Sequence, residues 1–369
     1  GSERGFYVSN NAGMTWQNFQ LNLPIVPVTD IMIRDNDLVA ATAGRAFWIL
    51  DDISAIQENA GFNEMNTVRL VTPKPAYKYG AGNGLPEKNP SQGQNAAEGV
   101  ILDYFLPEIG EKDTVSLTIL DNSGNVVRAY SNIKNESFKK YPGGPSEETL
   151  LEASKGHNRF LWDFRSNGVK PDVNGVYILG SYAGYALMPG IYKAQLKYKN
   201  TQSEASLTVL PNPGITATEA DWKEQQSVLK NIVASISDIH TAVNNIRKVK
   251  KQLQYHSETL TKVADAKIVA AEADSIIKKI DNWETAIVES RTQNGQDVIN
   301  WPSKLSVEFF NLKGLVDVSN PKITQGVKNR LLDLQNQWNT EKSKLDALYK
   351  SITSFNTLYK NTSIPALQL

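Results

Sequence analysis

The sequence predicts a multidomain protein in which a β-rich N-terminal part precedes an α-helical C-terminal part. Residues 1 to about 210 are rich in Gly, Pro, Asn, Tyr and β-branched residues in short alternating runs, whereas residues 216 to about 360 contain few Gly or Pro residues and show helical periodicity. The run Leu210-Pro211-Asn212-Pro213-Gly214 separates them, because it can continue neither a strand nor a helix. We therefore expect separate domains rather than one α/β sheet.

The first 55 residues are expected to contain four short strands, each ending at turn-forming residues. They lie near Gly5–Val8, Trp16–Leu21, Thr29–Ile33 and Leu38–Leu50, the last broken near Gly44. Four strands in this length of chain correspond to one blade of a β-propeller.

The residues between the first two strands form an Asp box. The run Ser9-Asn10-Asn11-Ala12-Gly13-Met14-Thr15-Trp16 matches the pattern Ser-x-Asp/Asn-x-Gly-x-Thr-Trp at every defined position. In such a hairpin Asn11 caps backbone N–H groups and Gly13 supplies a positive φ. We expect Trp16 to pack under the turn, against the next blade. The sequence therefore predicts residues 1–60 to be a terminal propeller blade, with Ser9, Asn11, Gly13, Thr15 and Trp16 as structural residues.

A propeller needs at least about four blades, and this sequence holds one. We expect the remaining blades to lie upstream in a longer precursor or in a second chain, and to be a partner of this chain. An orphan blade exposes sheet edges and an apolar flank, both of which favour pairing with another surface.

Residues 21–24, 27–30 and 41–52 resemble the last blade of large bacterial Asp-box proteins, the sortilin-like or sialidase-like propellers often labelled glycosyl hydrolases. That family usually carries His-Gly-Arg-Ser where this chain has Ala43-Gly44-Arg45-Ala46. The similarity continues through Asn95–Pro107, Gly156–Arg165, Gln296–Leu305 and Ile364–Ala366. The resemblance implies a bacterial protein exported to the periplasm, cell surface or medium, with a propeller, a β-sandwich and a helical tail. It carries over no catalytic residue.

Residues 99–213 are predicted to form an immunoglobulin-like β-sandwich, after a linker at 61–98 that is dense in Pro, Gly and Asn. Thr114–Leu120 shows the period of two that marks a half-buried strand, and a turn at 121–125 leads into its partner strand, Val126–Tyr130. Further strands are expected at Val100–Leu106, Gly156–Asp163, Ile191–Tyr198 and Ala205–Leu210.

Three motifs in this sandwich resemble the immunoglobulin-like domain of flagellar hook-capping proteins. They are Asp-x-x-Gly-x-Val-Val-Arg at 121–128, Asn-Arg-Phe-x-Trp-Asp at 158–163 and Pro-Gly-x-Tyr at 189–192. The resemblance implies a spacer or docking module. Trp162 is the expected core anchor, and Asp163 is expected to bond to nearby backbone. The insert Ser131–Lys155 and the loop Ser166–Leu187 are candidate partner-binding loops, with surface decoration as the alternative.

Residues 214–369 are predicted to form an antiparallel bundle of long helices with coiled-coil character. The first helix, capped by Thr216 or Thr218, carries an apolar stripe with steps of three and four: Leu229, Ile232, Ile236, Ile239, Val243, Ile246, Val249 and Leu253. Further helices are expected from about Lys262 to Asn294, near Ser303–Val316, and from about Pro321.

Composition excludes several classes of function. Lys plus Arg and Asp plus Glu both total 39, so the chain has no electrostatic reason to bind nucleic acid or an anionic membrane. No apolar run approaches the roughly 20 residues of a membrane span. The absence of cysteine excludes disulfides, thiolate nucleophiles and Cys-ligated zinc. The basic run Arg247, Lys248, Lys250 and Lys251 is predicted to be a solvated helix face, with an anionic partner as the alternative.

Candidate chemistry is sparse. The three histidines, His157, His240 and His256, are scattered over two domains, so no metal and no cofactor is expected. Arg45 and Asp51 form the possible polar site of the blade. Asp51 and Asp52 are adjacent on a strand and point to opposite faces, so they cannot act as the two carboxylates of a glycosidase. We expect them to cap the exit from the blade.

Two functions remain open. In the first, the chain is a non-catalytic accessory region that braces a propeller and binds a protein in a cell-surface or secretion assembly. In the second, it supports a sialidase-like glycoside hydrolase whose active site lies in other blades. The chain alone is expected to have no catalytic residue in either case.

Overall fold

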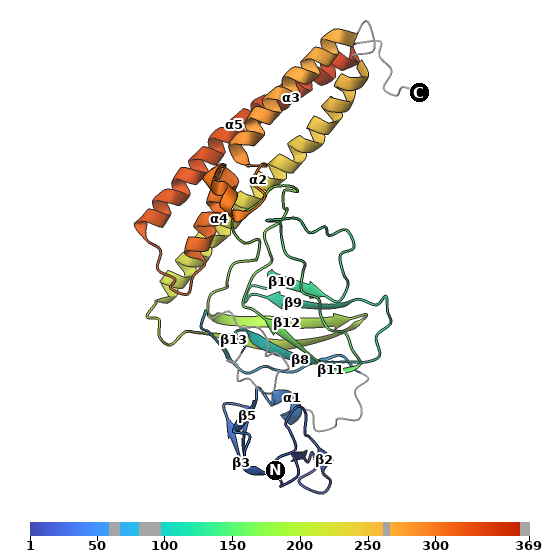
Figure 1. Cartoon of the computed structure of the whole chain (residues 1–369), viewed down its shortest axis with the longest axis vertical. Helices are drawn as coiled ribbons and strands as arrows, with labels where there is room; N and C mark the ends of the chain where they lie inside the picture. The colour runs from blue at the N-terminus through green and yellow to red at the C-terminus, as the bar shows by residue number, and fades with distance from the viewer. Residues whose placement is uncertain (59–66, 81–96, 261–265, 362–369) are drawn as a thin grey trace. The chain divides into compact units, whose positions relative to one another are not determined.

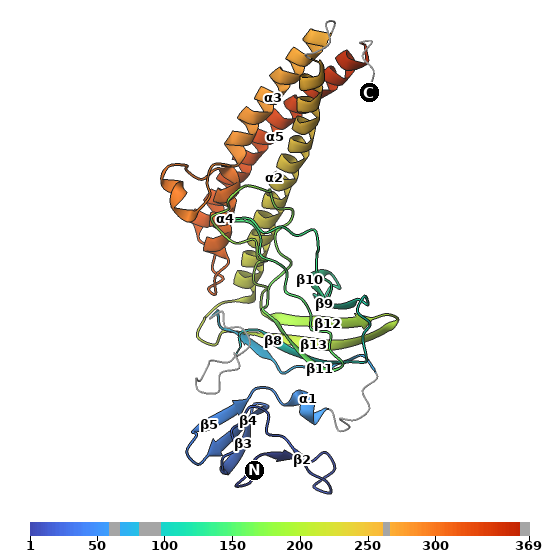
Figure 2. The same ribbon diagram turned by 45° about the vertical axis from the view of Figure 1, so that its right-hand side comes forward.

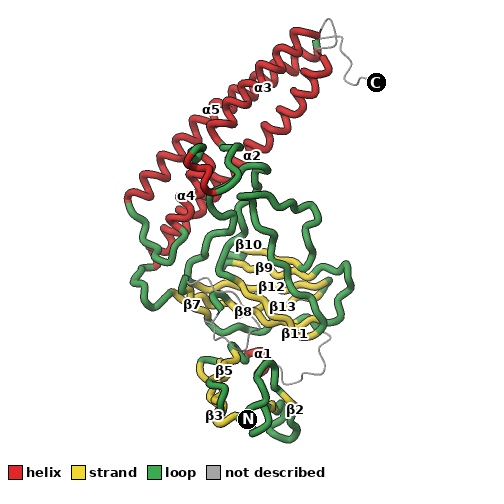
Figure 3. The backbone as a smooth tube through the Cα atoms, viewed as in Figure 1, coloured by secondary structure: helices red, strands yellow, loops and turns green. Residues whose placement is uncertain are grey.

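The computed structural model describes residues 1–58, 67–80, 97–260 and 266–361. These residues divide into two compact units. The first contains residues 1–137, 148–167 and 186–216, and the second contains residues 138–147, 168–185 and 217–369. The first is β-rich and the second is mainly helical, as the colours of Figure 3 show. The predicted order, β structure followed by helices, is therefore confirmed.

The N-terminal segment contains the predicted strands in two separate sheets. The strands β1 (Tyr7–Val8) and β2 (Gln17–Asn18), of two residues each, pair antiparallel in a hairpin. A three-stranded antiparallel sheet, called here the blade sheet, has the order β3-β4-β5. Its strands are β3 (Val28–Arg34), β4 (Asp37–Thr42) and β5 (Phe47–Leu50), and a short helix, α1 (Ser54–Gln57), follows.

The strand positions agree with the sequence, but a single four-stranded blade does not form among the described residues. The reason lies between β2 and β3. Leu21 adopts a positive φ of 46°, which turns the chain out of a strand, and Pro24 and Pro27 have no N–H to donate to a ladder.

The middle of the chain folds into two sheets (Figure 1). The larger has the order β10-β9-β12-β13-β7 and the smaller has the order β11-β8-β6. Their strands are β6 (Arg69–Leu70), β7 (Ala76–Lys78), β8 (Val100–Leu106), β9 (Val115–Leu120), β10 (Val126–Ser131), β11 (Gly156–Trp162), β12 (Gly190–Tyr198) and β13 (Thr201–Pro211). All six strands predicted after residue 99 are present, and the turn at 121–125 closes the β9–β10 hairpin.

Alternation along the strands places the core between the sheets. Val115, Leu117 and Ile119 of β9 are fully buried, as their period of two predicts. Trp162 is also fully buried, and its ring centroid lies 5.3 Å from that of Tyr192 in an edge-to-face contact. Trp162 is therefore the core anchor that the sequence indicates.

The region predicted as a linker, 61–98, contributes two strands to these sheets. β6 pairs antiparallel with β8, and β7 pairs parallel with β13. The sequence does not predict these strands, because a strand of two or three residues is too short to show a period and the surrounding Pro residues favour a loop. The middle of the predicted linker, 81–96, lies outside the described residues.

The second unit contains the helices α2 (Glu219–Leu260), α3 (Lys267–Ile287), α4 (Leu305–Val316) and α5 (Gln325–Lys360), with a 3₁₀ turn, η2, at Gly295–Ile299. α2 packs against α3 and α4, and α5 packs against the same two helices (Figure 2). Of the predicted stripe on α2, seven of the eight residues are buried; Val249 is intermediate. Among the described residues, no helix is both long and apolar enough to cross a membrane.

Two helix ends refine the prediction. Thr218, rather than Thr216, caps α2: its Oγ1 accepts from the N–H of Asp221, and the Asp221 carboxylate accepts from the N–H of Thr218. α3 ends at Ile287, earlier than Asn294, because Glu289 accepts bonds from the backbone and guanidinium of Arg291 and holds the chain in a turn.

The two predicted partner-binding loops contribute to the helical unit, in their segments 138–147 and 168–185. Asn244 of α2 donates to the carbonyl of Asp172 at 2.7 Å, and Arg247 donates to the carbonyl of Asn174 at 2.7 Å. Helix side chains thus bind loop carbonyls that no strand pairs.

Candidate functional site

The Asp-box hairpin forms a closed network of hydrogen bonds. The backbone N–H of Gly13 donates to Ser9 Oγ at 2.7 Å, and that of Thr15 donates to Asn11 Oδ1 at 2.9 Å. Asn11 Nδ2 donates to Thr15 Oγ1 at 2.8 Å, and Trp16 Nε1 donates to the carbonyl of Gly13 at 3.1 Å. Gly13 has a φ of +86°, as the turn requires. The structure thus brings the five predicted residues together, in a turn that satisfies its own polar groups.

The ring of Trp16 folds back on this turn but is 63% exposed in the chain. A Cβ at Gly13 would lie 3.8 Å from the ring, so one side of the indole faces the hairpin. The expected packing against a next blade is not present in the described residues. The other side of the ring is open to solvent.

The blade sheet carries an apolar surface, called here the open face. Cross-strand pairing places Val39 of β4 between Met32 of β3 and Ile49 of β5, and Ala41 beside Phe47, all on one side of the sheet. Met32 and Ile49 are each 62% exposed and Phe47 is 74% exposed. Large apolar side chains in a row on a sheet face are typical of a surface that another layer covers.

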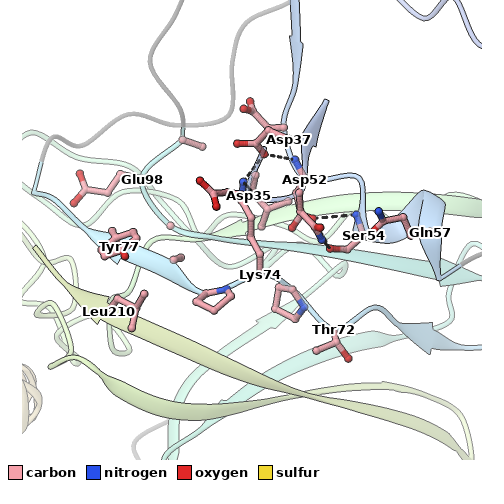
Figure 4. Close-up of a pocket in the computed structure, with 18 of the residues that line it drawn as sticks. Asp35, Asp37, Asp52, Ser54, Gln57, Thr72, Lys74, Tyr77, Glu98 and Leu210 are labelled. Carbon is pink, nitrogen blue, oxygen red and sulfur yellow. Dashed lines mark hydrogen bonds and ion pairs between the residues drawn. The ribbon is translucent and has the colours of Figure 1, made fainter. Parts of the chain in front are cut away.

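A cavity of about 1110 Å³ lies in the first unit. It is lined by the β3–β4 turn, the chain from Asp51 to Glu58, the chain from Thr72 to Tyr79, the start of β8 and Leu210 (Figure 4). Asp35 and Asn36, in the turn, have positive φ values of 50° and 66°. This tight turn brings their side chains and that of Asp37 to the cavity.

The Lys74 side chain extends toward Asp35 and Asp37 (Figure 4). Its ammonium group forms an ion pair with the Asp37 carboxylate and donates to the carbonyl of Asp35 at 3.5 Å. Asp37 Oδ1 also accepts from the backbone N–H of Asp52 at 2.9 Å. The carboxylate of Asp37 therefore binds both Lys74 and the backbone of Asp52, in the segment that follows the blade sheet.

Asp51 and Asp52 follow β5, which ends at Leu50, rather than lie on the strand as predicted. The N-cap of α1 is Ile53, which makes no side-chain capping bond, and Asp52 instead binds Ser54. Asp52 Oδ1 accepts from the backbone N–H of Ser54 at 3.0 Å and from Ser54 Oγ at 2.5 Å, at the start of α1. Asp51 lines the cavity without a side-chain hydrogen bond among the described residues. Burial, followed by repulsion from Asp37, raises the pKa of Asp51 above its ordinary value.

Arg45, the other predicted polar residue of the blade, is exposed and does not line this cavity. Its backbone carbonyl accepts from Trp48 Nε1 at 2.9 Å, which closes the β4–β5 turn. The structure therefore places Asp51 in the cavity and Arg45 outside it.

The sequence did not predict a buried ion pair between Asp103 and Arg159, which lies against the backbone of Asp51 and Asp52. Asp103 accepts from Arg159 and His157, and Arg159 also donates to the carbonyls of Asp51 and Asp52, both at 3.3 Å. A signal existed: Arg159 and Asp103 lie directly opposite each other in the β11–β8 ladder. Recognising it required the pairing register of two strands that are more than fifty residues apart.

The histidines do not converge. His240 is fully buried between the carbonyl of Pro171 and the hydroxyl of Ser306, both at 2.8 Å. His157 contacts Asp103, and His256 packs near Phe355. In the part of the chain that the structure describes, no group of His, Cys, Asp and Glu could hold a metal ion.

The basic run on α2 is partly neutralised within its own unit. Arg247 pairs with Glu284 at 2.6 Å, and Lys250 pairs with Asp281. These pairs favour the predicted solvated face over an anionic partner.

Comparison with known proteins adds little. No protein-family model matches the sequence, and no curated protein matches it. Among solved structures there is a weak similarity to β-glucuronidase from Bifidobacterium dentium, complexed with coumarin-3-O-glucuronide, at 10% identity and a TM-score of 0.17. That match covers 39% of this chain and 18% of the β-glucuronidase chain.

Proposed function

We propose that this chain is a non-catalytic accessory region of an exported Asp-box propeller protein. In this proposal residues 1–58 form a terminal blade, the two sheets form an immunoglobulin-like spacer, and the chain braces the propeller and binds a protein of a cell-surface or secretion assembly. The remaining blades, upstream or in a second chain, are its first partner.

The observation that supports this proposal is the open face of the blade sheet. Met32, Ile49 and Phe47 expose most of their apolar surface to water, and the tryptophan ring of the Asp-box hairpin is also exposed. Burial of apolar surface is worth about 25 cal/mol per Å², so covering these side chains stabilises an assembly. Sheets of adjacent blades pack face to face, which suits a sheet with an exposed apolar face.

The experiment uses the absence of cysteine, since a single introduced thiol can be labelled uniquely. Ile49→Cys reports on the open face, and Asn122→Cys, in the exposed turn between β9 and β10, is the matched control. Each variant is made both in this chain and in the protein as its source organism produces it, and maleimide labelling rates are compared. We expect Ile49→Cys to be labelled quickly in this chain and slowly in the native material, whereas Asn122→Cys is labelled equally in both.

Native mass by light scattering accompanies this measurement. Material that contains further blades, together with protection of Ile49→Cys, supports the proposal. Equal labelling of Ile49→Cys in both preparations contradicts it, as does native material with the mass of this chain alone. Hydrolase activity in the native material that requires residues of the other blades would instead favour the supporting role in a glycoside hydrolase.

A further inference from the structure

The two edge strands of the blade sheet, β3 and β5, differ in how their outer backbone groups are satisfied (Figure 2). On β3 the N–H of Val28 donates to the carbonyl of Ser2 at 3.0 Å, and the N–H of Ile31 donates to Asp30 Oδ1 at 2.8 Å. Asp30 and Arg34 also place exposed charges along this strand. Charges at an edge discourage pairing with a further strand, so the outer edge of β3 is protected.

The hydrogen bonds of the β4–β5 ladder show which backbone groups of β5 point outward. The N–H of Thr42 donates to the carbonyl of Ala46, so these two residues form a hydrogen-bonded pair. Such pairs alternate along an antiparallel ladder, and the register therefore bonds Trp48 to β4 and leaves Phe47 and Ile49 in non-bonded pairs. The N–H and carbonyl groups of Phe47 and Ile49 point away from β4, and they have no partner within the described part of the chain.

The strand β5 lacks the features that protect an edge strand. Its four residues, Phe47–Leu50, include no charged residue, no proline and no glycine. Its ladder with β4 runs without a register shift. An apolar edge strand with free N–H and carbonyl groups is a template for pairing with another strand.

The blade sheet is also one strand short. A propeller blade is a four-stranded sheet, and the blade sheet has three strands. β1 and β2 pair with each other in a separate sheet, so neither of them is the fourth strand. The open face reaches the free edge, because Phe47 and Ile49 contribute to both. A strand beside β5 would therefore extend the same apolar surface.

We propose that β5 pairs with an antiparallel strand from the remaining blades, which completes the blade sheet. This inference rests on the proposed function, since those blades are the partner that the proposed function requires. The added strand is an extended segment of about four residues, with no proline where it donates to β5 and with apolar side chains at alternate positions, toward the open face.

Amide hydrogen exchange, followed residue by residue by mass spectrometry, tests this pairing. It is measured in this chain and in the protein as its source organism produces it. In this chain we expect Phe47 and Ile49 to exchange quickly, and Trp48 and Leu50, which are bonded to β4, to exchange slowly. In the native material we expect the exchange of Phe47 and Ile49 to slow at least about tenfold, because their N–H groups donate to the added strand.

The labelling of Ile49→Cys separates this inference from the proposed function. Native material in which Ile49→Cys is protected, but the amides of Phe47 and Ile49 still exchange quickly, overturns the edge pairing and leaves the proposed function standing. Native material with the mass of this chain alone contradicts both. Slow exchange of the two amides already in this chain overturns the pairing with another blade, and a doubled mass would then identify a second copy of this chain at the edge.

Two variants at position 49 identify the outward N–H as the cause. Ile49→Pro removes that N–H and leaves the bonds to β4 in place, whereas Ile49→Ala loses the same side chain from the open face and keeps the N–H. In the native material we expect the exchange of Phe47 to be at least about tenfold faster in Ile49→Pro than in Ile49→Ala. Equal protection of Phe47 in the two variants overturns the pairing. If Ile49→Pro does not fold, the exchange of the unmodified protein still decides the proposal.

Discussion

Arg159 and Asp103 form a bidentate ion pair that connects the blade exit to the smaller sheet of the first unit. Arg159 Nε lies 2.8 Å from Asp103 Oδ1, and Nη2 lies 2.9 Å from Oδ2. Burial opposes the ionised form of Asp103, but the hydrogen bonds from His157 and Arg159 outweigh it and keep the pKa of Asp103 below its ordinary value. The same guanidinium binds the carbonyls of Asp51 and Asp52, so one residue serves both the ion pair and the start of α1.

Removing the arginine should therefore cost more than a surface ion pair does. Arg159→Gln leaves a nearly buried Asp103 without its main partner, and we expect the free energy of unfolding to fall by about 3–5 kcal/mol. Chemical denaturation followed by tryptophan fluorescence measures this change. Lys193→Gln, which breaks an exposed pair with Glu204, is the control and should cost less than about 1 kcal/mol. A loss for Arg159→Gln as small as that of the control would contradict a structural role for the pair.

The Asp-box tryptophan should contribute little to the stability of the chain by itself. Full burial of Trp16 would make Trp16→Ala cost about 3–5 kcal/mol. Because 63% of its surface is exposed, we expect a loss of about 1 kcal/mol or less in this chain. In an assembly in which another sheet covers the ring, the same substitution should cost the larger amount. Comparing melting temperatures of the two forms tests both values, and a large loss in the isolated chain would show that the ring is already buried.

The hairpin glycine should be more sensitive than the tryptophan. Gly13 has a φ of +86°, and a Cβ there would be strained even though the nearest ring atom is 3.8 Å away. We expect Gly13→Ala to cost about 1–2 kcal/mol. Gly124→Ala is the matched control for backbone strain. Gly124 has a φ of +80° and no atom within 4 Å of an added Cβ, so its substitution should cost a similar free energy. Tolerance of alanine at Gly13 would mean that the turn relaxes to another conformation.

Features with a local period could be predicted from the sequence, and features that depend on distant pairing could not. The alternation of β9, the burial of Trp162 and the stripe of α2 follow from patterns within one element. The strands β6 and β7 are too short to show a period, and they exist because β8 and β13 offer edges for pairing.

The candidate site shows the same division. The Asp-box residues lie within eight positions, so their spacing alone predicts the turn. The sequence predicts Asp51 as a polar site residue. Lys74, Tyr77 and Glu98 also line the cavity, and no sequence motif connects them to Asp51. Asp51 and Asp52 were expected to cap the exit from the blade; Asp52 binds the backbone N–H and hydroxyl of Ser54, whereas the N-cap of α1 is Ile53.

Purified chain should not hydrolyse glycosides. The carboxylates closest to the blade exit are engaged in structure, since Asp37 pairs with Lys74 and Asp52 holds Ser54. A glycosidase needs one protonated and one ionised carboxyl group placed on either side of a bond. We expect no turnover of aryl glycosides or a sialoside above the buffer rate. Turnover by pure material that is abolished in Asp51→Asn would contradict this prediction, and turnover that persists in that variant would indicate a contaminant.

His240 should make the helical unit less stable in mild acid. Burial, against the opposing effects of the Pro171 carbonyl and Asp172, lowers the pKa of His240 to about 4 in the folded chain, from 6.5 in the unfolded chain. Between these values the unfolded chain binds more protons, so the stabilisation is fully present above about pH 6.5 and is lost as the pH falls toward 4. We expect the free energy of unfolding to decrease by about 2 kcal/mol from about pH 7 to about pH 5.

Urea denaturation followed by circular dichroism at 222 nm measures this loss in the helices. His240→Gln keeps a donor and an acceptor toward Pro171 and Ser306 but cannot gain a proton, so its pH dependence in this window should be about 2 kcal/mol weaker than that of the unmodified chain. Groups such as Asp103, whose pKa is lowered from 3.8, lose their contribution only at more acidic pH and do not obscure the comparison. If both proteins lose the same free energy of unfolding between these pH values, a group other than His240 takes up the proton, and the prediction is wrong.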